Sequence, residues 1–326
     1  MRLLRLETEG VRGVPDGRYL FNPEGYTLVT GAAASGKTRL LGAIGALKEG
    51  AGAYGAPPSA KEVLRDEAAS GVLAGTFRLN PTERERCRLD GWEVDVRWDL
   101  ANQPLPELPA AVRRLLAVYE AGDRVGRFEH FPACRGGFED PRELPSRPPV
   151  DPSDMTDRLG SGPRKYGWVR RFFADRVAAD ARALRAHLGE RGIALRSDLP
   201  SSLYGFDRAL DTLAPGLRFL EVEPTERSPL VFFGRKGGGR VELGQLSASE
   251  QHAIVFAAVS KHLALSHSVL LIDTPEAGIH PEHHATFFDG LLDLGTDNQV
   301  IAATSSAPLL RRAPAAAVID LGRGGR

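Results

Sequence analysis

The sequence predicts an α/β fold with a central parallel β-sheet, and three segments carry that prediction. Residues 26–30 form a short strand-like run, Tyr-Thr-Leu-Val-Thr, followed by a glycine-containing loop and a helix-like stretch over 38–47. Residues 269–273 and the run that begins at Gln299 are apolar at most positions, as strands covered on both faces are. We therefore expect parallel strands with helices packed against them.

Further elements are expected in order along the chain. Leu3 to Glu7 alternates as an edge strand does, and residues 71–79 and 92–98 have the two-residue period of strands. We expect a helix over 108–119, a strand over 127–132, a long helix over 164–192 and an apolar helix over 253–264. Arginines at the start of the long helix indicate either phosphate contacts or a solvated face.

Length, charge and cysteine content limit the class of protein. The 326 residues suffice for one large α/β domain or two small ones. Forty-two basic residues balance forty-two acidic ones, so any contact with DNA must be local. Cys87 and Cys134 lie far apart without metal-ligand spacing, which favours a reducing cytosol and argues against zinc. No run of eighteen apolar residues occurs, so we expect a cytoplasmic protein with no membrane segment.

The loop after the first predicted parallel strand fits the phosphate-binding pattern G-x-x-x-x-G-K-[ST] at every fixed position. Its glycines let the backbone approach phosphate oxygens, while backbone N–H groups, the helix N-terminus and a lysine supply positive charge. A glycine-rich turn with an incidental lysine does not explain the strand and helix on either side. The predicted residues of this loop that bind a nucleoside triphosphate are Gly31, Ala32, Ala33, Ala34, Ser35, Gly36, Lys37 and Thr38.

The second half of the chain supplies an acidic partner for a magnesium ion. Asp273 ends the apolar strand 269–273, and we expect it to hold Mg²⁺ together with the Thr38 hydroxyl. A buried strand that merely ends in aspartate is the alternative, which the preceding phosphate loop disfavours. Upstream, Ser247 and Glu250 have capping-box spacing at the start of the helix before this strand.

The order of these motifs resembles the ATP-binding-cassette (ABC) ATPases, in which a signature motif stands where this chain has Leu-Ser-Ala-Ser-Glu-Gln at 246–251. Within them it is most similar to the SMC, RecF and OLD branch. The turn Val-Arg-Gly-Val at 11–14, the string Asp-Thr-Pro-Glu-Ala-Gly-Ile-His-Pro at 273–281 and Gly-Gln-Leu-Ser at 244–247 carry that likeness. It spans residues 1–50 and 220–320.

The resemblance implies a P-loop NTPase fold: a single ABC-type head with mixed and parallel sheets. The nucleotide-binding core would be 1–135 and 221–326, with a mainly helical insertion over 136–220. It also implies a homodimer that sandwiches two Mg-ATP molecules, with Ser247, Ser249 and Glu250 at the γ-phosphate held by the other copy. From the distance between Lys37 and Ser247 and from the residues after Asp273, we expect neither a long coiled coil nor a TOPRIM nuclease domain. The expected effector, a nuclease or similar, is therefore a separate protein, acting in DNA repair or defence against foreign DNA.

Departures from the family pattern leave two interpretations open. Thr274 stands where the family has its catalytic glutamate, and Ser305 stands where it has a switch histidine. Lys37, Asp273, Glu276 and Ser305 are the expected catalytic residues, with Glu276 a candidate replacement for the base. The chain is then either an ATPase with slow turnover or an ATP-dependent dimerisation switch that hydrolyses little. A transporter ATPase subunit is a third possibility, disfavoured by the 273–281 string.

Three histidines over 280–284 form the pattern His-Pro-Glu-His-His, which raises the question of a metal site. His280 matches the family's His-Pro turn, and ligands at other positions are not evident. We therefore expect His283 and His284 on a solvated helix.

Overall fold

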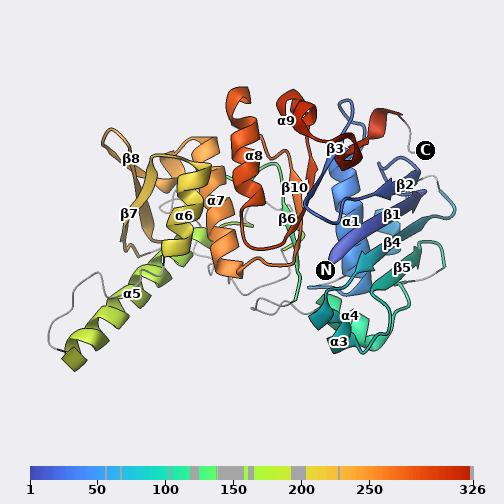
Figure 1. Cartoon of the computed structure of the whole chain (residues 1–326), viewed down its shortest axis with the longest axis horizontal. Coiled ribbons are helices and arrows are strands. Elements are labelled where there is room, and N and C mark those ends of the chain that lie inside the picture. Colours follow the sequence, from blue (N-terminus) through green and yellow to red (C-terminus); the bar gives the residue numbers. More distant parts are fainter. Residues whose placement is uncertain are drawn as a thin grey trace. The chain divides into compact units, whose positions relative to one another are not determined.

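The computed structural model describes residues 1–55, 57–66, 68–102, 104–117, 125–136, 138, 158–160, 165–191, 203–226 and 228–323. These residues belong to two compact units, each described by itself (Figure 1). The first unit comprises Met1–Ala133, Met155–Ser161 and Ala264–Arg326, and the second comprises Cys134–Asp154 and Gly162–Leu263. Both ends of the sequence therefore build the first unit.

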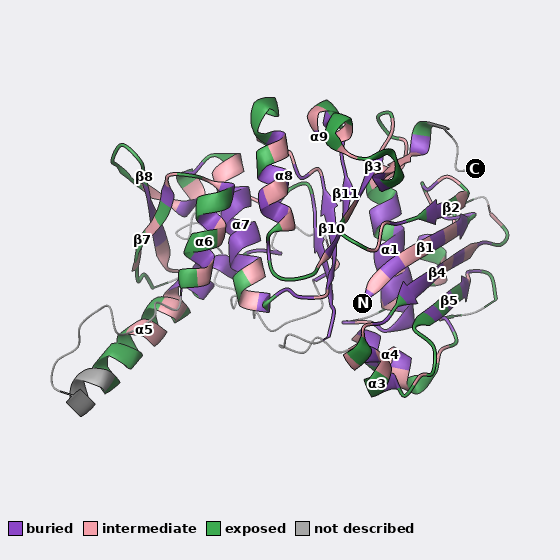
Figure 2. Cartoon of the chain, in the orientation of Figure 1, coloured by how far each residue is buried: buried purple, intermediate pink, exposed green. Residues whose placement is uncertain are grey.

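A five-stranded parallel sheet forms the centre of the first unit, in the order β12-β3-β11-β10-β6. Every residue of β10 and β11 is buried, as Figure 2 shows, because both faces of these strands are covered. This confirms the predicted α/β fold with a parallel sheet. The strands are β3 (Tyr26–Thr30), β6 (Phe128–Phe131), β10 (Val269–Asp273), β11 (Gln299–Ala303) and β12 (Val318–Asp320).

A second, antiparallel sheet of four strands has the order β2-β1-β4-β5. Because β1 pairs with a strand on each side, the prediction that residues 3–7 form an edge strand was wrong. The alternation of β1 reports burial of one sheet face and carries no information about hydrogen bonding at its edges. The strands are β1 (Arg2–Glu9), β2 (Gly17–Leu20), β4 (Val72–Arg78) and β5 (Glu93–Asp99).

Helix α1 (Lys37–Ala51) joins the two sheets, since it contacts β4 and β5 of one and β10 and β11 of the other. Its apolar residues Leu40, Leu41, Ile44 and Leu47 are at most 1% exposed and belong to the main hydrophobic core. Burial of several such side chains, each contributing about 1.5–3 kcal/mol, fixes the start of the helix relative to both sheets.

The remaining helices of the first unit are short. They are α2 (Ala60–Val63), α3 (Pro81–Cys87), α4 (Ala110–Ala117), α8 (His284–Leu292), α9 (Ala307–Arg312) and the 3-10 helices η3 (Pro281–His283), η4 (Ala315–Ala317) and η5 (Leu321–Arg323).

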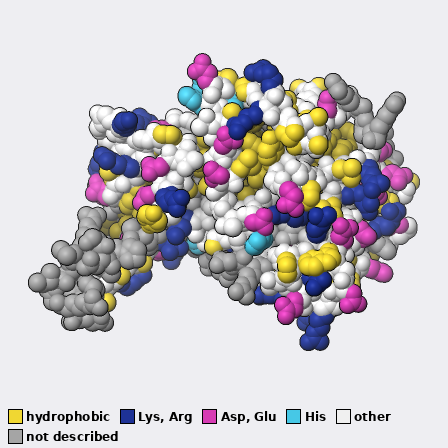
Figure 3. All heavy atoms as spheres, viewed as in Figure 1, with side chains coloured by type: hydrophobic (Ala, Val, Ile, Leu, Met, Phe, Trp, Pro, Cys, Tyr) yellow, Lys and Arg dark blue, Asp and Glu magenta, His cyan; other side chains and the backbone are white. Residues whose placement is uncertain are grey.

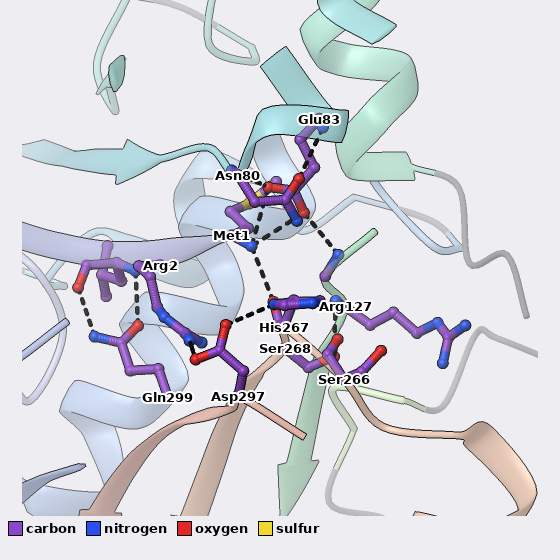
Figure 4. Close-up of polar contacts among 12 residues, drawn as sticks. Met1, Arg2, Asn80, Glu83, Arg127, Ser266, His267, Ser268, Asp297 and Gln299 are labelled. Carbon is purple, nitrogen blue, oxygen red and sulfur yellow. Dashed lines mark hydrogen bonds and ion pairs between the residues drawn. The ribbon is translucent and has the colours of Figure 1, made fainter. Parts of the chain in front are cut away.

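Polar contacts also tie the two sheets together (Figure 4). The Gln299 side chain on β11 accepts from the backbone N–H of Leu3 on β1 at 2.7 Å and donates to its carbonyl oxygen at 2.8 Å. The Met1 amino group donates to Glu83 of α3 at 3.0 Å and to the carbonyl oxygen of His267 at 2.9 Å. These contacts, of which the Met1 bonds are charge-assisted, hold β1 beside the parallel sheet.

Among its described residues, the second unit pairs three α-helices with a small antiparallel sheet of order β7-β8-β9. Aromatic rings fill its core: Phe173 of α5 lies 4.9 Å from Phe206 of α6 and 5.2 Å from Phe219 of β7, between ring centroids. The elements are α5 (Val169–Arg191), α6 (Tyr204–Leu213), β7 (Leu217–Glu223), β8 (Leu230–Arg235), β9 (Arg240–Glu242), the 3-10 helix η2 (Leu243–Gln245) and α7 (Ala248–Leu263).

Charge and hydrophobicity at the surface agree with the balanced composition. Basic and acidic side chains are interspersed on the face shown in Figure 3. Among the helices that the structure describes, none is both long and apolar enough to cross a membrane.

Candidate nucleotide-binding site

The loop between β3 and α1 has a backbone shape that depends on its two fixed glycines. Gly31 and Gly36 have φ angles of 148° and 98°, a region that favours glycine. A Cβ atom at Gly31 would lie 2.5 Å from Ser35 Oγ, and one at Gly36 would lie 2.5 Å from the Gly13 carbonyl oxygen. Larger residues at either position would displace the loop.

Positive groups gather at this loop. Helix α1 begins at Lys37 without a side-chain cap, so the N–H groups of its first turn are available to a ligand. Lys37 Nζ donates to the carbonyl oxygens of Gly31 and Ala32, each at 2.9 Å, and so lies across the loop. Ala32, Ala33 and Ala34 are exposed along it. An ammonium group, an uncapped helix N-terminus and closely approaching backbone fit a phosphate chain.

Thr38 and Asp273 line one pocket of about 640 Å³ that runs along α1. Asp273 ends β10 and is 7% exposed, whereas Thr38 is exposed in the first turn of α1. A hydroxyl and a carboxylate beside a phosphate loop fit Mg²⁺, which is bound through one or two protein oxygens together with phosphates and waters. In the described part of the chain no cluster of three or more His, Cys, Asp and Glu side chains forms a metal cage.

Thr274, directly after Asp273, carries a hydroxyl, which cannot act as a general base at neutral pH. It adopts a left-handed backbone conformation with φ 49°, which is unusual for a β-branched residue. Its N–H donates to the Ala303 carbonyl oxygen at 2.8 Å, and its hydroxyl donates to Asp273 Oδ1 at 3.2 Å. The hydroxyl therefore supports the Asp273 carboxylate.

Glu276 and Ser305, two predicted catalytic residues, are brought together. Glu276 Oε1 accepts from Thr304 Oγ1 at 2.8 Å and from the backbone N–H of Ser305 at 3.0 Å. Glu276 Oε2 is buried and has no hydrogen-bond partner among the described residues. The side chain of Ser305 is exposed.

The topology explains why these segments meet. The 31–38 loop, the turn containing Glu276 and the segment containing Ser305 follow the carboxyl ends of β3, β10 and β11, which are neighbours in the parallel sheet. Asp273 is in register with Ala303, and Ala303 with Val29. Ligand sites of open parallel sheets form at this edge.

The predicted signature residues form a separate group within the second unit, at the start of α7. Glu250 Oε2 accepts from the Ser247 N–H at 2.8 Å and its hydroxyl at 2.7 Å, and Ser247 Oγ lies 3.2 Å from Ser249 Oγ. Arg235 of β8 donates to both carboxylate oxygens of Glu250, at 2.9 and 2.7 Å. Partial burial favours a raised pKa for Glu250, but hydrogen bonds from Arg235 and Ser247 outweigh it and lower the pKa.

The three histidines over 280–284 do not share one environment. His280 and His283 are exposed, as expected for His283, but His284 is 8% exposed, so its prediction as a solvated residue was wrong. Burial of its ring costs little because both nitrogens have partners: Nδ1 lies 2.8 Å from Ser306 Oγ, and Nε2 lies 2.9 Å from the Ile279 carbonyl oxygen.

Sequence reasoning missed three residues that contact the predicted site residues or their neighbours: Thr304, Arg235 and His284. Thr304 had a usable signal, because it follows the buried strand β11 at the edge where the site forms. Arg235 and His284 had no such signal. The partner of Arg235 lies in a different element, and the partners of His284 depend on how α8 packs.

The parallel sheet and the phosphate loop define a P-loop NTPase fold. A family model described as "AAA domain, putative AbiEii toxin, Type IV TA system" matches residues 141–312, and the chain belongs to this family. The match includes β10 and the Glu276 and Ser305 segments and begins after the phosphate loop. Together these findings confirm an ABC-type P-loop ATPase.

The chain is similar to solved structures of SMC heads. An SMC head bound to the C-winged helix domain of ScpA is 14% identical, with a TM-score of 0.54, over 98% of this chain and 94% of that one. A head with an extended coiled coil, bound to the C-terminal domain of ScpA derived from Pyrococcus furiosus, has 12% identity, coverages of 95% and 91% and a TM-score of 0.49. The SMC head domain from Thermotoga maritima is 16% identical over 93% of this chain and 90% of that one, with a TM-score of 0.45. The first shows the fold. None of the curated protein sequences matches this chain.

Proposed function

We propose that this chain is a Mg-ATP-dependent ATPase whose two copies close on two nucleotides. The phosphate loop carries the proposal, because its glycines, uncapped helix start and Lys37 ammonium group form a cradle for an anionic chain. The loop holds the phosphates, while Thr38 and Asp273 hold Mg²⁺. When bound, Mg²⁺ neutralises charge on the phosphate oxygens. Residues 1–135 and 221–326 form the nucleotide-binding core in this proposal, with 136–220 as an insertion.

Hydrolysis would use Glu276 in place of the family's glutamate. Its Oε1 is held by Thr304 and Ser305, whereas its Oε2 is buried without a hydrogen-bond partner in the described part of the chain. In this proposal closure of two copies on ATP places a water beside Oε2, which then accepts its proton. The exposed Ser305 hydroxyl donates to the γ-phosphate. Ser247, Ser249 and Glu250 complete the site from the second copy, which the helix N-terminus of α7 and its serine hydroxyls support.

ATP-driven closure would be coupled to a separate effector protein in DNA repair or in defence against foreign DNA. An SMC head with the same fold is bound to a domain of ScpA, and the family description refers to a type IV toxin–antitoxin system. Any DNA contact would be local, given the interspersed surface charges. The unpaired thiols of Cys87 and Cys134 support a cytoplasmic location.

A dimerisation switch with little hydrolysis is the second candidate function. Thr274 favours it, because its hydroxyl donates to Asp273 and has no basic group to offer water at neutral pH. ATP would then hold two copies together until it dissociates.

Nucleotide binding and single-turnover hydrolysis by the purified chain distinguish the two. We expect Lys37→Ala to slow hydrolysis by about a hundredfold or more, since it removes a positive group from the transferred phosphate. Lys61→Ala, an exposed lysine on α2, is the matched control and should behave as the wild type. Tight ATP binding without phosphate release would reject the ATPase in favour of the switch, and absence of ATP binding would reject both.

A further inference from the structure

The buried ring of His284 has a fixed pattern of hydrogen-bond donors and acceptors. Its Nε2 faces the Ile279 carbonyl oxygen, which only accepts, so Nε2 carries the proton. In the neutral ring Nδ1 then accepts, and the Ser306 hydroxyl donates to it. Ser306 Oγ in turn accepts from the N–H of Leu309 at the start of α9. Each of these hydrogen-bonding atoms is therefore fixed as either a donor or an acceptor.

The series of hydrogen bonds continues from Ser306 to Glu276. The Ser306 N–H donates to Thr304 Oγ1 at 3.0 Å, which leaves the Thr304 hydroxyl proton directed at Glu276 Oε1 at 2.8 Å. The Ser305 N–H donates to the same oxygen. The orientation of the Glu276 carboxylate is therefore set by the segment 304–306, and that segment is anchored from behind by His284.

We infer that His284 is a positioning residue for Glu276. It holds Ser306 and, through Thr304 and Ser305, binds Glu276 Oε1, so that Oε2 is the oxygen left to accept a proton. At 8% exposure its ring does not offer a nitrogen to a ligand, so it acts only through these neighbours. The inference rests on the proposed function of Glu276. It assigns a role to His284, a residue that the sequence analysis predicted to be solvated.

Two substitutions of His284 separate positioning from general support of the fold. An asparagine amide oxygen lies near the place of Nδ1 and can accept from Ser306, whereas a glutamine amide lies nearer to Nε2 and can donate to Ile279. Each variant keeps one of the two hydrogen bonds. We expect His284→Gln to lower the rate of single-turnover hydrolysis at saturating ATP about tenfold, because a misplaced catalytic group is costly. His284→Asn should stay within about twofold of the wild type, and ATP affinity should not change in either.

The exposed neighbour His283 provides the matched control. His283→Gln and His283→Asn should leave the rate unchanged, since this ring lies outside the chain of hydrogen bonds. Equal rates for His284→Gln and His284→Asn, or a loss in ATP affinity that accounts for the slower reaction, would overturn the inference.

A stability measurement tests the same link without requiring hydrolysis. His284→Gln and Glu276→Ala should lower Tm non-additively, because residues in one hydrogen-bond network are energetically coupled. Additive Tm losses would contradict the link between the two residues. If the wild type hydrolyses no ATP but the losses are non-additive, the proposed ATPase activity fails while the link between His284 and Glu276 holds.

Discussion

At the scale of single residues, Lys48 shows how burial changes the pKa of a charged side chain. Its side chain is fully buried at the end of α1, with Nζ 2.8 Å from Glu49 Oε1 and 2.7 Å from the centroid of the Tyr54 ring. Burial lowers the pKa of Lys48 to about 7, although the neighbouring Glu49 carboxylate opposes that change. The free energy that a buried ammonium group loses by desolvation exceeds the electrostatic stabilisation that one carboxylate partner provides.

This lowered pKa predicts that the folded protein becomes more stable as pH rises above 7. Between about pH 7 and pH 10 the unfolded chain keeps the Lys48 proton while the folded chain has lost it. The free energy of unfolding then increases with pH by about 1.4 kcal/mol per unit from this group. Urea unfolding at intervals from pH 7 to 9.5 measures it, with Lys48→Met as the uncharged comparison. If Lys48→Met retains the same pH slope, the assignment to Lys48 is wrong.

At the scale of elements, strands were predictable where burial covers both faces. The predicted limits of β10 agree with the structure because an unbroken apolar run ending in aspartate has few other placements. Helix α7 starts at Ala248, five residues before the apolar stretch, because the Ser247 and Glu250 capping box begins it. Strand β7 was missed, since Leu217 is its one buried residue and its apolar side chains occupy both faces.

The residues of the candidate site also differ in how far the sequence predicts them. The phosphate loop and Asp273 are local patterns, each contained in one strand and the turn that follows it. The partners of Glu276 and Glu250 come from other elements, so single-sequence patterns do not report them. Glu250 and Arg235, for example, come from α7 and β8, which are separate elements (Figure 1).

The contact between β8 and α7 predicts a role for Arg235 in closing two copies. Arg235 balances the Glu250 carboxylate beside Ser247, where the proposal places a γ-phosphate. Without that arginine, the carboxylate repels the phosphate, so we expect Arg235→Ala to weaken ATP-dependent dimerisation a few-fold, as exposed ion pairs contribute about 0.2–1 kcal/mol. ATP binding by a single copy should not change. Analytical ultracentrifugation with a slowly hydrolysed ATP analogue measures this.

Matched variants test the electrostatic explanation. Lys236→Ala removes the next basic residue on the same hairpin and should leave dimerisation intact. Adding Glu250→Gln to Arg235→Ala removes the unbalanced charge, while the glutamine amide oxygen can still accept from Ser247, so this change should restore dimerisation. Failure of this second change to restore dimerisation would indicate that Arg235 acts by supporting the fold.

At the scale of the whole molecule, the proposed ATP site is divided between copies, and this division can be tested by mixing variants. Lys37→Ala removes the phosphate grip of one copy, and Ser247→Ala removes the group it offers to its partner. Either variant alone forms dimers in which both sites are defective. In a mixed dimer, one site combines the intact Lys37 of one copy with the intact Ser247 of the other.

Equal amounts of Lys37→Ala and Ser247→Ala should therefore recover about a quarter of the wild-type hydrolysis rate. Half of the randomly assorted dimers are mixed, and each has one intact site of two in a symmetric pair. Steady-state phosphate release from the mixture measures the recovery, and a mixture of Lys37→Ala with itself after the same treatment is the control. Activity no higher than the average of the two separate variants would mean that each copy works alone, because a site contained in one chain cannot be repaired by another.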